Sequence, residues 1–155
     1  MPSRATLFTG LTPRGHEVRT NGIPLDPRYP TIVQALAGAG WRTHSVGKLH
    51  MRTFGLPEDV GPEDLDPAEW PEARAMWSTG RLKAVPTPYY GFQSVELVTS
   101  HGPGAHGDYG RWLDTQNPRA QELMRPDAGR PSPHGAESTW TMALPEELHL
   151  SLIHI

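Results

Sequence analysis

The clearest hydrophobic pattern in the chain lies between residues 31 and 47. Apolar residues recur there at the spacing of one helix face, and Thr31 and Gln34 have the spacing of a capping box. The apolar positions are Ile32, Val33, Leu36 and Ala39. Gly40 is suited to ending this helix, and residues 42–46 fit a short strand that ends at Gly47. We therefore predict a helix followed by a strand, with the helix packed on the strand.

A second strand and a second helix follow later in the chain. Val95, Leu97 and Val98 indicate a strand over residues 93–99. Residues 108–113 predict a short helix, and residues 73–77 a single helical turn. Core packing is expected for the apolar face of the helix, which comprises Tyr109, Trp112 and Leu113. Helices alternating with strands are typical of an α/β fold.

The amino end of the chain predicts one further helix, over residues 2–9. Pro2 suits the first helical position, where its missing N–H has no cost, and Gly10 suits the residue after the helix. The exposed N–H groups and the positive dipole at such an amino end favour an anion, and Arg4 adds a permanent positive charge. A merely solvated Arg4 is the alternative interpretation.

Composition predicts that loops fill much of the chain. The 155 residues are 36% hydrophobic and include 17 Pro and 16 Gly. Residues 11–30, 55–88 and 117–138 have loop or insertion composition, and the carboxylates of residues 55–72 are expected to be solvated. The net charge of -3 is small and mixed, so we expect neither nucleic acid nor an anionic membrane as a partner. No apolar run reaches transmembrane length, and the absence of Cys excludes disulfides and thiolate metal sites.

Lys48 and His50 follow the predicted strand directly, with one residue between them. In α/β sheets, ligand-binding groups lie beyond the carboxyl ends of strands. A lysine can neutralise an oxyanion, and a histidine can transfer a proton near neutral pH. Two solvated loop residues are the alternative interpretation. We expect the earlier His16 to be solvated or paired with the backbone, because no second ligand lies at metal spacing.

These motifs together resemble the sulfatase family, part of the alkaline phosphatase superfamily. Pro2-Ser3-Arg4 with Thr9-Gly10 is similar to the sulfatase signature Cys-x-Pro-Ser-Arg-x-x-x-x-Thr-Gly, in which the Cys becomes a formylglycine nucleophile. Gly47-Lys48-Leu49-His50 is similar to the family's Gly-Lys-x-His motif. The residues that match a family segment between the two motifs are His16, Val18, Asn21 and Gly22. Met1 takes the x position of the signature, so the Cys would fall directly before it.

The resemblance implies a doubly wound domain with long loops, of which residues 1–149 would be an amino-terminal part. It implies that Lys48 contacts the sulfate group, that His50 acts as the base that expels sulfate, and that Arg4 holds the nucleophile in place. The substrate would be a small-molecule or carbohydrate sulfate ester. Calcium would be the metal of the complete enzyme, with its ligands outside this chain, so residues 1–155 are expected to be inactive alone.

Other interpretations stay open at this stage. A phosphonate monoester or phosphodiester hydrolase of the same superfamily would share the Pro-Ser-Arg segment, and a small non-catalytic binding module is an alternative from another class. His101 and His106 are too loosely spaced to indicate a metal site without a third partner. Residues 143–149 resemble the start of a helix. Residues 150–155 read as translated sequencing-adapter text, so we expect a non-native tail.

Overall fold

The computed structural model describes residues 1–100 and 106–119. The helices are α1 (Pro2–Thr9), α2 (Ile32–Gly38), α3 (Arg74–Ser78) and α4 (Asp108–Gln116), with a short 3-10 helix at Pro62–Asp64. The strands are β1 (His44–Gly47), β2 (Ser94–Thr99) and β3 (His106–Gly107). The predictions for His101, for most of the loop at 117–138, for the helix start at 143–149 and for the tail at 150–155 lie outside the described residues.

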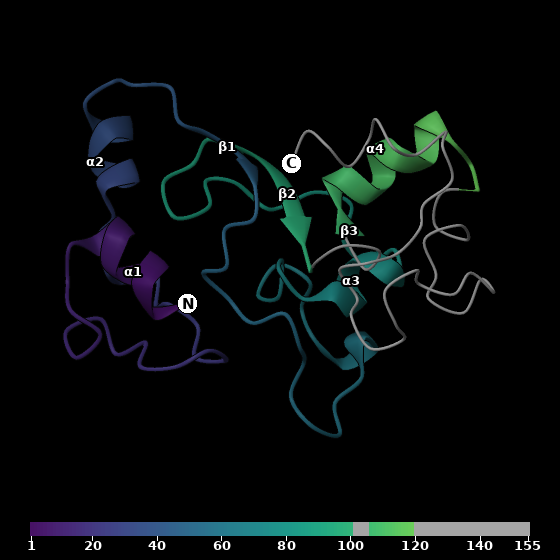
Figure 1. The fold of residues 1–155 in the computed structure, drawn as a ribbon, viewed down its shortest axis with the longest axis horizontal. Coiled ribbons are helices and arrows are strands. Elements are labelled where there is room, and N and C mark those ends of the chain that lie inside the picture. The colour runs from purple at the N-terminus through teal and green to yellow at the C-terminus, as the bar shows by residue number, and fades with distance from the viewer. Residues whose placement is uncertain (101–105, 120–155) are drawn as a thin grey trace, which may run out of the picture.

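The three strands form one mixed sheet in the order β1-β2-β3 (Figure 1). β1 and β2 are parallel, with His44 opposite Ser94 and Gly47 opposite Leu97. β3 pairs with the end of β2 in the antiparallel direction. Strands were predicted at both places, and the bounds of β1 and β2 differ from the predictions by no more than two residues. The mixed α/β class is therefore confirmed.

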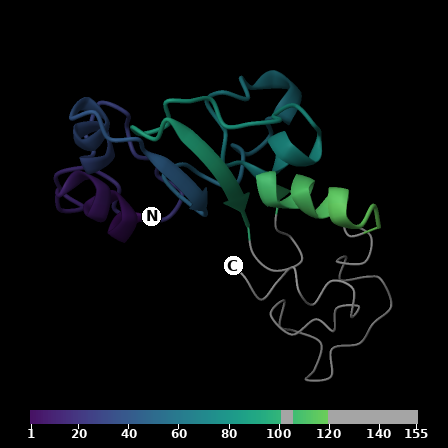
Figure 2. The same ribbon diagram turned by 90° about the horizontal axis from the view of Figure 1, so that it is seen from above.

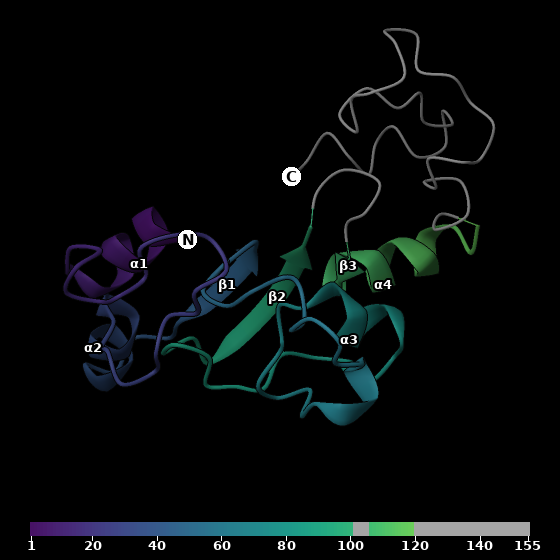
Figure 3. The same ribbon diagram turned by 90° about the horizontal axis from the view of Figure 1, so that it is seen from below.

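The helices divide between the two ends of this sheet. In all three views α1 and α2 lie together beyond β1, whereas α3 and α4 lie beside β2 and β3 (Figures 1, 2 and 3). The chain segments that carry Arg4 and Lys48 therefore belong to the same end of the molecule. The part of the chain that the structure describes has no helix long and apolar enough to cross a membrane.

Local signals explain the helix ends. Pro2 occupies the first turn of α1, and Gly10 ends the helix in the left-handed conformation with a φ of 70°, which glycine adopts without steric cost. At α2 the predicted capping box is present, because the Thr31 hydroxyl accepts from the Gln34 amide and the Gln34 side chain accepts from the Thr31 amide. Both predicted helix starts are confirmed.

The predicted packing of α2 was wrong. Only Val33 of the expected apolar stripe is buried, and Ile32 remains 56% exposed. The helix contacts α1 and the turn before β2 instead of resting mainly on β1. The Thr31 hydroxyl donates to the Tyr90 carbonyl oxygen over 2.7 Å, which fixes the helix by its first turn and leaves the Ile32 face uncovered.

The face of α4 was also only partly predicted. Gly110 and Leu113 are buried where the helix packs on β2 and β3, but Trp112 is 46% exposed. Leu113 lies three residues after Gly110, so these two share a face, and Trp112 is rotated away from it. The Trp112 ring contacts Tyr109 at 5.8 Å between centroids and is not a core residue.

The core is built mostly from loop residues around the strands. It combines one central strand residue with side chains from the turns and from α3. Its most deeply buried members are Val18, Leu25, Met51, Ala73, Met76 and Leu97. The loop composition expected for residues 11–30 and 55–72 is confirmed, since the only regular element there is the 3-10 helix at Pro62–Asp64.

Candidate functional site

Lys48 leaves the carboxyl end of β1 and turns toward an aromatic ring. Gly47 makes the turn with a φ of 108°, a conformation that favours glycine. The Lys48 Nζ lies 4.3 Å from the centroid of the Phe54 ring, and the residue is half-buried. A cation over an aromatic face is attracted by the quadrupole of the ring. Phe54 therefore helps to fix the position of the ammonium group.

His50 contacts the same ring. The imidazole stacks on Phe54 with 4.0 Å between centroids and 20° between planes. His50 has a φ of 61°, which is uncommon for a residue with a side chain. The sequence placed Lys48 and His50 on one turn, and the structure adds that both side chains lie against Phe54.

Arg4 and Lys48 come together although they are far apart in the sequence. Arg4 lies in the first turn of α1. Burial, and after it the positive charge of Arg4, lower the pKa of the Lys48 ammonium group, while the charge of Glu72 opposes this. Burial, Arg4 and Lys48 also lower the pKa of the Met1 amine, while the charge of Glu72 raises it. This amine donates to the Asn21 Oδ1 over 2.8 Å.

A cavity of about 760 Å³ opens beside His50 and Phe54. Its wall includes Asn21 and Gly22 from the loop after α1. The remaining wall is largely apolar and consists of Thr53, Gly55, Leu56, Pro57 and Trp70. Lys48 contacts Phe54 and the Met1 amine contacts Asn21, so both groups lie behind residues of this wall. His50 therefore borders a space large enough for a small molecule, and Arg4, Lys48 and Met1 are not among the residues that line it.

Glu72 is the residue that the sequence missed. It was expected to be solvated with the other carboxylates of residues 55–72, but it is 0% exposed. The Glu72 Oε2 accepts from the His50 amide over 2.5 Å, and the Oε1 accepts from the amides of Met51 and Arg52 over 2.7 and 2.9 Å. The Tyr89 hydroxyl donates to the Oε1 over 2.8 Å. The sequence gives no signal for this, and only the structure shows that Glu72 is buried together with its neighbours Pro71 and Ala73.

Burial raises the pKa of the Glu72 carboxyl, and the four hydrogen bonds act against that shift. Burial and the neighbouring Glu72 raise the pKa of the Tyr89 phenol well above its usual range, so Tyr89 stays a donor at neutral pH. A buried carboxylate with four donors is satisfied within the protein. Glu72 therefore stabilises the turn that carries His50.

His16 is paired with the backbone, which is one of the two environments expected for it. It is buried, its Nδ1 accepts from the Val18 amide over 3.2 Å, and its Nε2 lies 3.0 Å from the Thr6 hydroxyl. Because the Nδ1 accepts, the Nε2 carries the proton and donates to Thr6. His16 thus ties the loop after α1 to that helix.

The residues present do not fit a calcium site. Residues 1–100 and 106–119 contain no cluster of three or more histidines and carboxylates that could hold a metal ion. Glu72 has its oxygens occupied by amides and a phenol. His106 lies in β3, where its Nε2 is buried without a hydrogen-bond partner, and its expected neighbour His101 lies outside the described residues.

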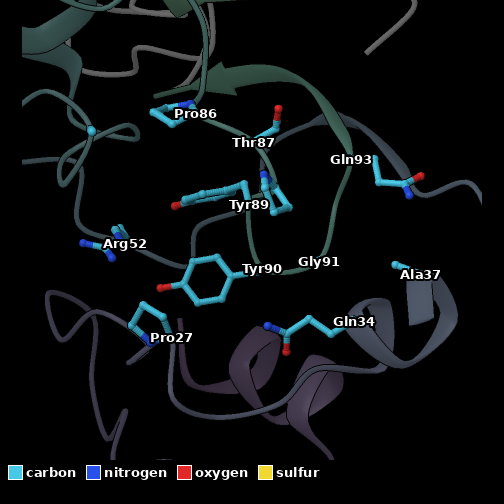
Figure 4. A pocket seen from close by; sticks show the side chains of 12 residues that line it. Pro27, Gln34, Ala37, Arg52, Pro86, Thr87, Tyr89, Tyr90, Gly91 and Gln93 are labelled. Atoms are coloured by element: carbon cyan, nitrogen blue, oxygen red, sulfur yellow. The ribbon is translucent and has the colours of Figure 1, made fainter.

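A second cavity, of about 750 Å³, has Tyr89 and Tyr90 among its lining residues (Figure 4). Figure 4 shows the rings of Tyr89 and Tyr90 on its wall, with Gln34 of α2 opposite them. Burial raises the pKa of the Tyr90 phenol to about 12, and this hydroxyl donates to the Leu25 carbonyl oxygen. Its wall includes neither His50 nor Phe54, the ring on which Lys48 and His50 rest. We therefore place the candidate site at the His50 cavity and not here.

Comparison with protein-family models, curated proteins and solved structures finds no match to this chain. The motifs and their geometry are therefore the grounds for a function.

Proposed function

We propose that this chain is part of a sulfatase-like hydrolase, and that Arg4, Lys48 and His50 serve one anion pocket. The observation that carries the proposal is that Lys48 and His50 leave one turn and rest on the same Phe54 ring, with His50 on the wall of a cavity. Arg4 also lies near enough for its charge to lower the pKa of Lys48, although the loop of residues 11–30, α2 and β1 separate the two in sequence. Positive charge from Arg4 and Lys48 in a partly desolvated place favours a bound anion, and the charge of Glu72 offsets part of it.

The place of the missing nucleophile supports the same proposal. In the sulfatase signature, the Cys would be joined to the nitrogen of Met1. That nitrogen lies with Arg4 and Lys48 and donates to the Asn21 Oδ1. The amino end of α1 adds the positive end of its dipole. A sulfate ester at this point would meet positive charge on several sides.

The proposed roles follow from the chemistry of each side chain. Lys48 and Arg4 stabilise the negative charge on the sulfate oxygens. His50 transfers a proton at its imidazole, which borders the cavity of about 760 Å³. The apolar wall beside His50, with Phe54, Leu56 and Trp70, would receive the alcohol part of the ester. Calcium has no fitting ligands in the described residues, so no step is assigned to it.

The fold is compatible with this proposal at a coarser level. β1 and β2 are parallel, and Lys48 leaves the carboxyl end of β1, where doubly wound sheets bind ligands. We propose that this sheet is a part of the doubly wound sulfatase fold and that residues 1–149 are an amino-terminal part of its catalytic domain.

An activity assay tests the function. The 155-residue chain and the gene product that includes the codons before Met1 are made in a host that generates formylglycine. Both are assayed with calcium on an aryl sulfate, an aryl phosphonate and a phosphodiester. We expect sulfate hydrolysis by the longer product and none by the short chain. Turnover only of the phosphorus esters would assign the chain to the related phosphonate and phosphodiester hydrolases, and binding without any turnover would favour a binding module.

A further inference from the structure

The backbone of residues 50–52 is wrapped around the carboxylate of Glu72. The amides of His50, Met51 and Arg52 all donate to it, at 2.5, 2.7 and 2.9 Å. Successive amides that converge in this way form an anion-binding concavity. Here the bound anion is a side chain of the same protein, 22 residues from His50 in sequence.

We propose that Glu72 is the positioning residue of the site, whose carboxylate holds the turn that presents His50 and Lys48 to a bound anion. The effect of Glu72 on anion binding rests on the proposed function. The effect of Glu72 on the turn is independent of that function, because it follows from the hydrogen bonds alone.

The turn needs such a holder because its backbone is strained. His50 has a φ of 61°, a left-handed conformation that residues with a side chain adopt only at a cost in free energy. The same segment around Glu72 also holds Phe54, since the Arg74 amide donates to the Phe54 carbonyl oxygen over 3.1 Å. Phe54 in turn contacts both His50 and Lys48. Glu72 and its neighbours thus fix the turn and the ring against which both side chains rest.

The charge of Glu72 and its hold on the turn predict opposite effects on anion binding when Glu72 is replaced. Glu72 is near enough for its charge to raise the pKa of Lys48. A negative charge near an anion site repels the anion, so its removal would tighten anion binding if charge were its main effect. If Glu72 acts by holding the turn, its removal weakens anion binding in spite of the more positive site.

The test compares Glu72→Gln with Glu69→Gln in the 155-residue chain. Glu69 is exposed and contacts the turn through its carbonyl oxygen, which accepts from the Arg52 guanidinium and is kept in the variant, so the control makes the same change in net charge. Hydrogen exchange of the backbone amides is measured by NMR, and sulfate and inorganic phosphate are titrated separately into each protein. For Glu72→Gln we expect the amides of residues 50–52 to exchange about tenfold faster or more, and the affinity for both anions to fall about tenfold. For Glu69→Gln both should stay near the wild type.

Amides of β2 and α4 report whether Glu72→Gln still folds. If they lose protection too, Tyr89→Phe replaces it, because this variant removes one of the four hydrogen bonds and keeps the charge. Unchanged exchange at residues 50–52, or anion binding as tight as in Glu69→Gln, would overturn the inference. A wild-type chain that binds neither anion would count against the proposed function. Faster exchange at residues 50–52 in the variant would, even then, support Glu72 as the holder of the turn.

Discussion

The hydroxyl of Tyr89 donates a hydrogen bond to the buried carboxylate of Glu72 over 2.8 Å. The two residues are 17 positions apart, and both are buried. The ring of Tyr89 lines the second cavity, whereas its hydroxyl faces the turn that carries His50. Tyr89 therefore connects the wall of one cavity to the support of the other.

Removal of the Tyr89 hydroxyl should destabilise the protein measurably. Tyr89→Phe leaves the Glu72 Oε1 with two amide donors, and the loss of a buried hydrogen bond to a charged group costs about 1.5–3 kcal/mol. We expect the free energy of unfolding to fall by that amount in urea titrations. Tyr29→Phe is the control, because the Tyr29 hydroxyl bonds only exposed groups and its loss should cost less than about 0.5 kcal/mol. Equal losses in the two variants would contradict this role of Tyr89.

Neutralisation of Lys48 should weaken anion binding specifically. Lys48→Met keeps the length of the side chain and removes one charge from the cluster with Arg4. We expect sulfate affinity, measured by calorimetry, to fall about tenfold, the effect of losing one charged hydrogen bond. Lys83→Met removes the same charge from an exposed position and should change the affinity less than about twofold. A similar loss in both variants would indicate binding by net charge and not by a site.

Anion binding should weaken as the pH rises, in two steps. Burial and Arg4 lower the pKa of Lys48 from 10.5, and burial, Arg4 and Lys48 lower that of the Met1 amine from 8.0. Because only the protonated forms are positive, affinity is complete below both pKa values and is lost as the pH rises through each.

The check is calorimetric titration of sulfate at a series of pH values from about 6 to about 10, around the usual values of these groups. We expect the first decrease below pH 8.0 and the second below pH 10.5. Acetylation of the Met1 amine should remove the first step only. Constant affinity across the series would show that neither group contacts the anion.

A methyl group at Gly91 should disrupt the contact between α2 and the turn before β2. Gly91 has a φ of 97°, and a Cβ there would lie 2.4 Å from the Gln34 amide nitrogen, which is backbone and cannot move aside alone. Gly40→Ala is a matched control, because Gly40 has a φ of 88° and open space around it. We expect about 1 kcal/mol of destabilisation in the control and about 2–4 kcal/mol in Gly91→Ala, from thermal or urea unfolding. Equal effects would show that φ alone restricts Gly91.

The local elements of this chain were determined by the sequence. Pro2 and Gly10 bound α1, and Thr31 with Gln34 starts α2, because each signal acts within one or two helical turns. The strands near residues 44 and 94 could be predicted for the same reason. Lys48 and His50 were found as candidate residues because they follow a strand directly and match a motif.

The tertiary structure alone decided which side chains are buried and which contacts form the site. Nothing near Glu72 in the sequence shows that the amides of residues 50–52 will surround it, since those donors arrive from 20 to 22 positions away. Phe54 becomes the ring beneath Lys48 and His50 only when the loop closes. In the same way, the apolar pattern of α2 could not reveal that Ile32 stays exposed, because burial depends on what packs against a face and periodicity records only the face itself.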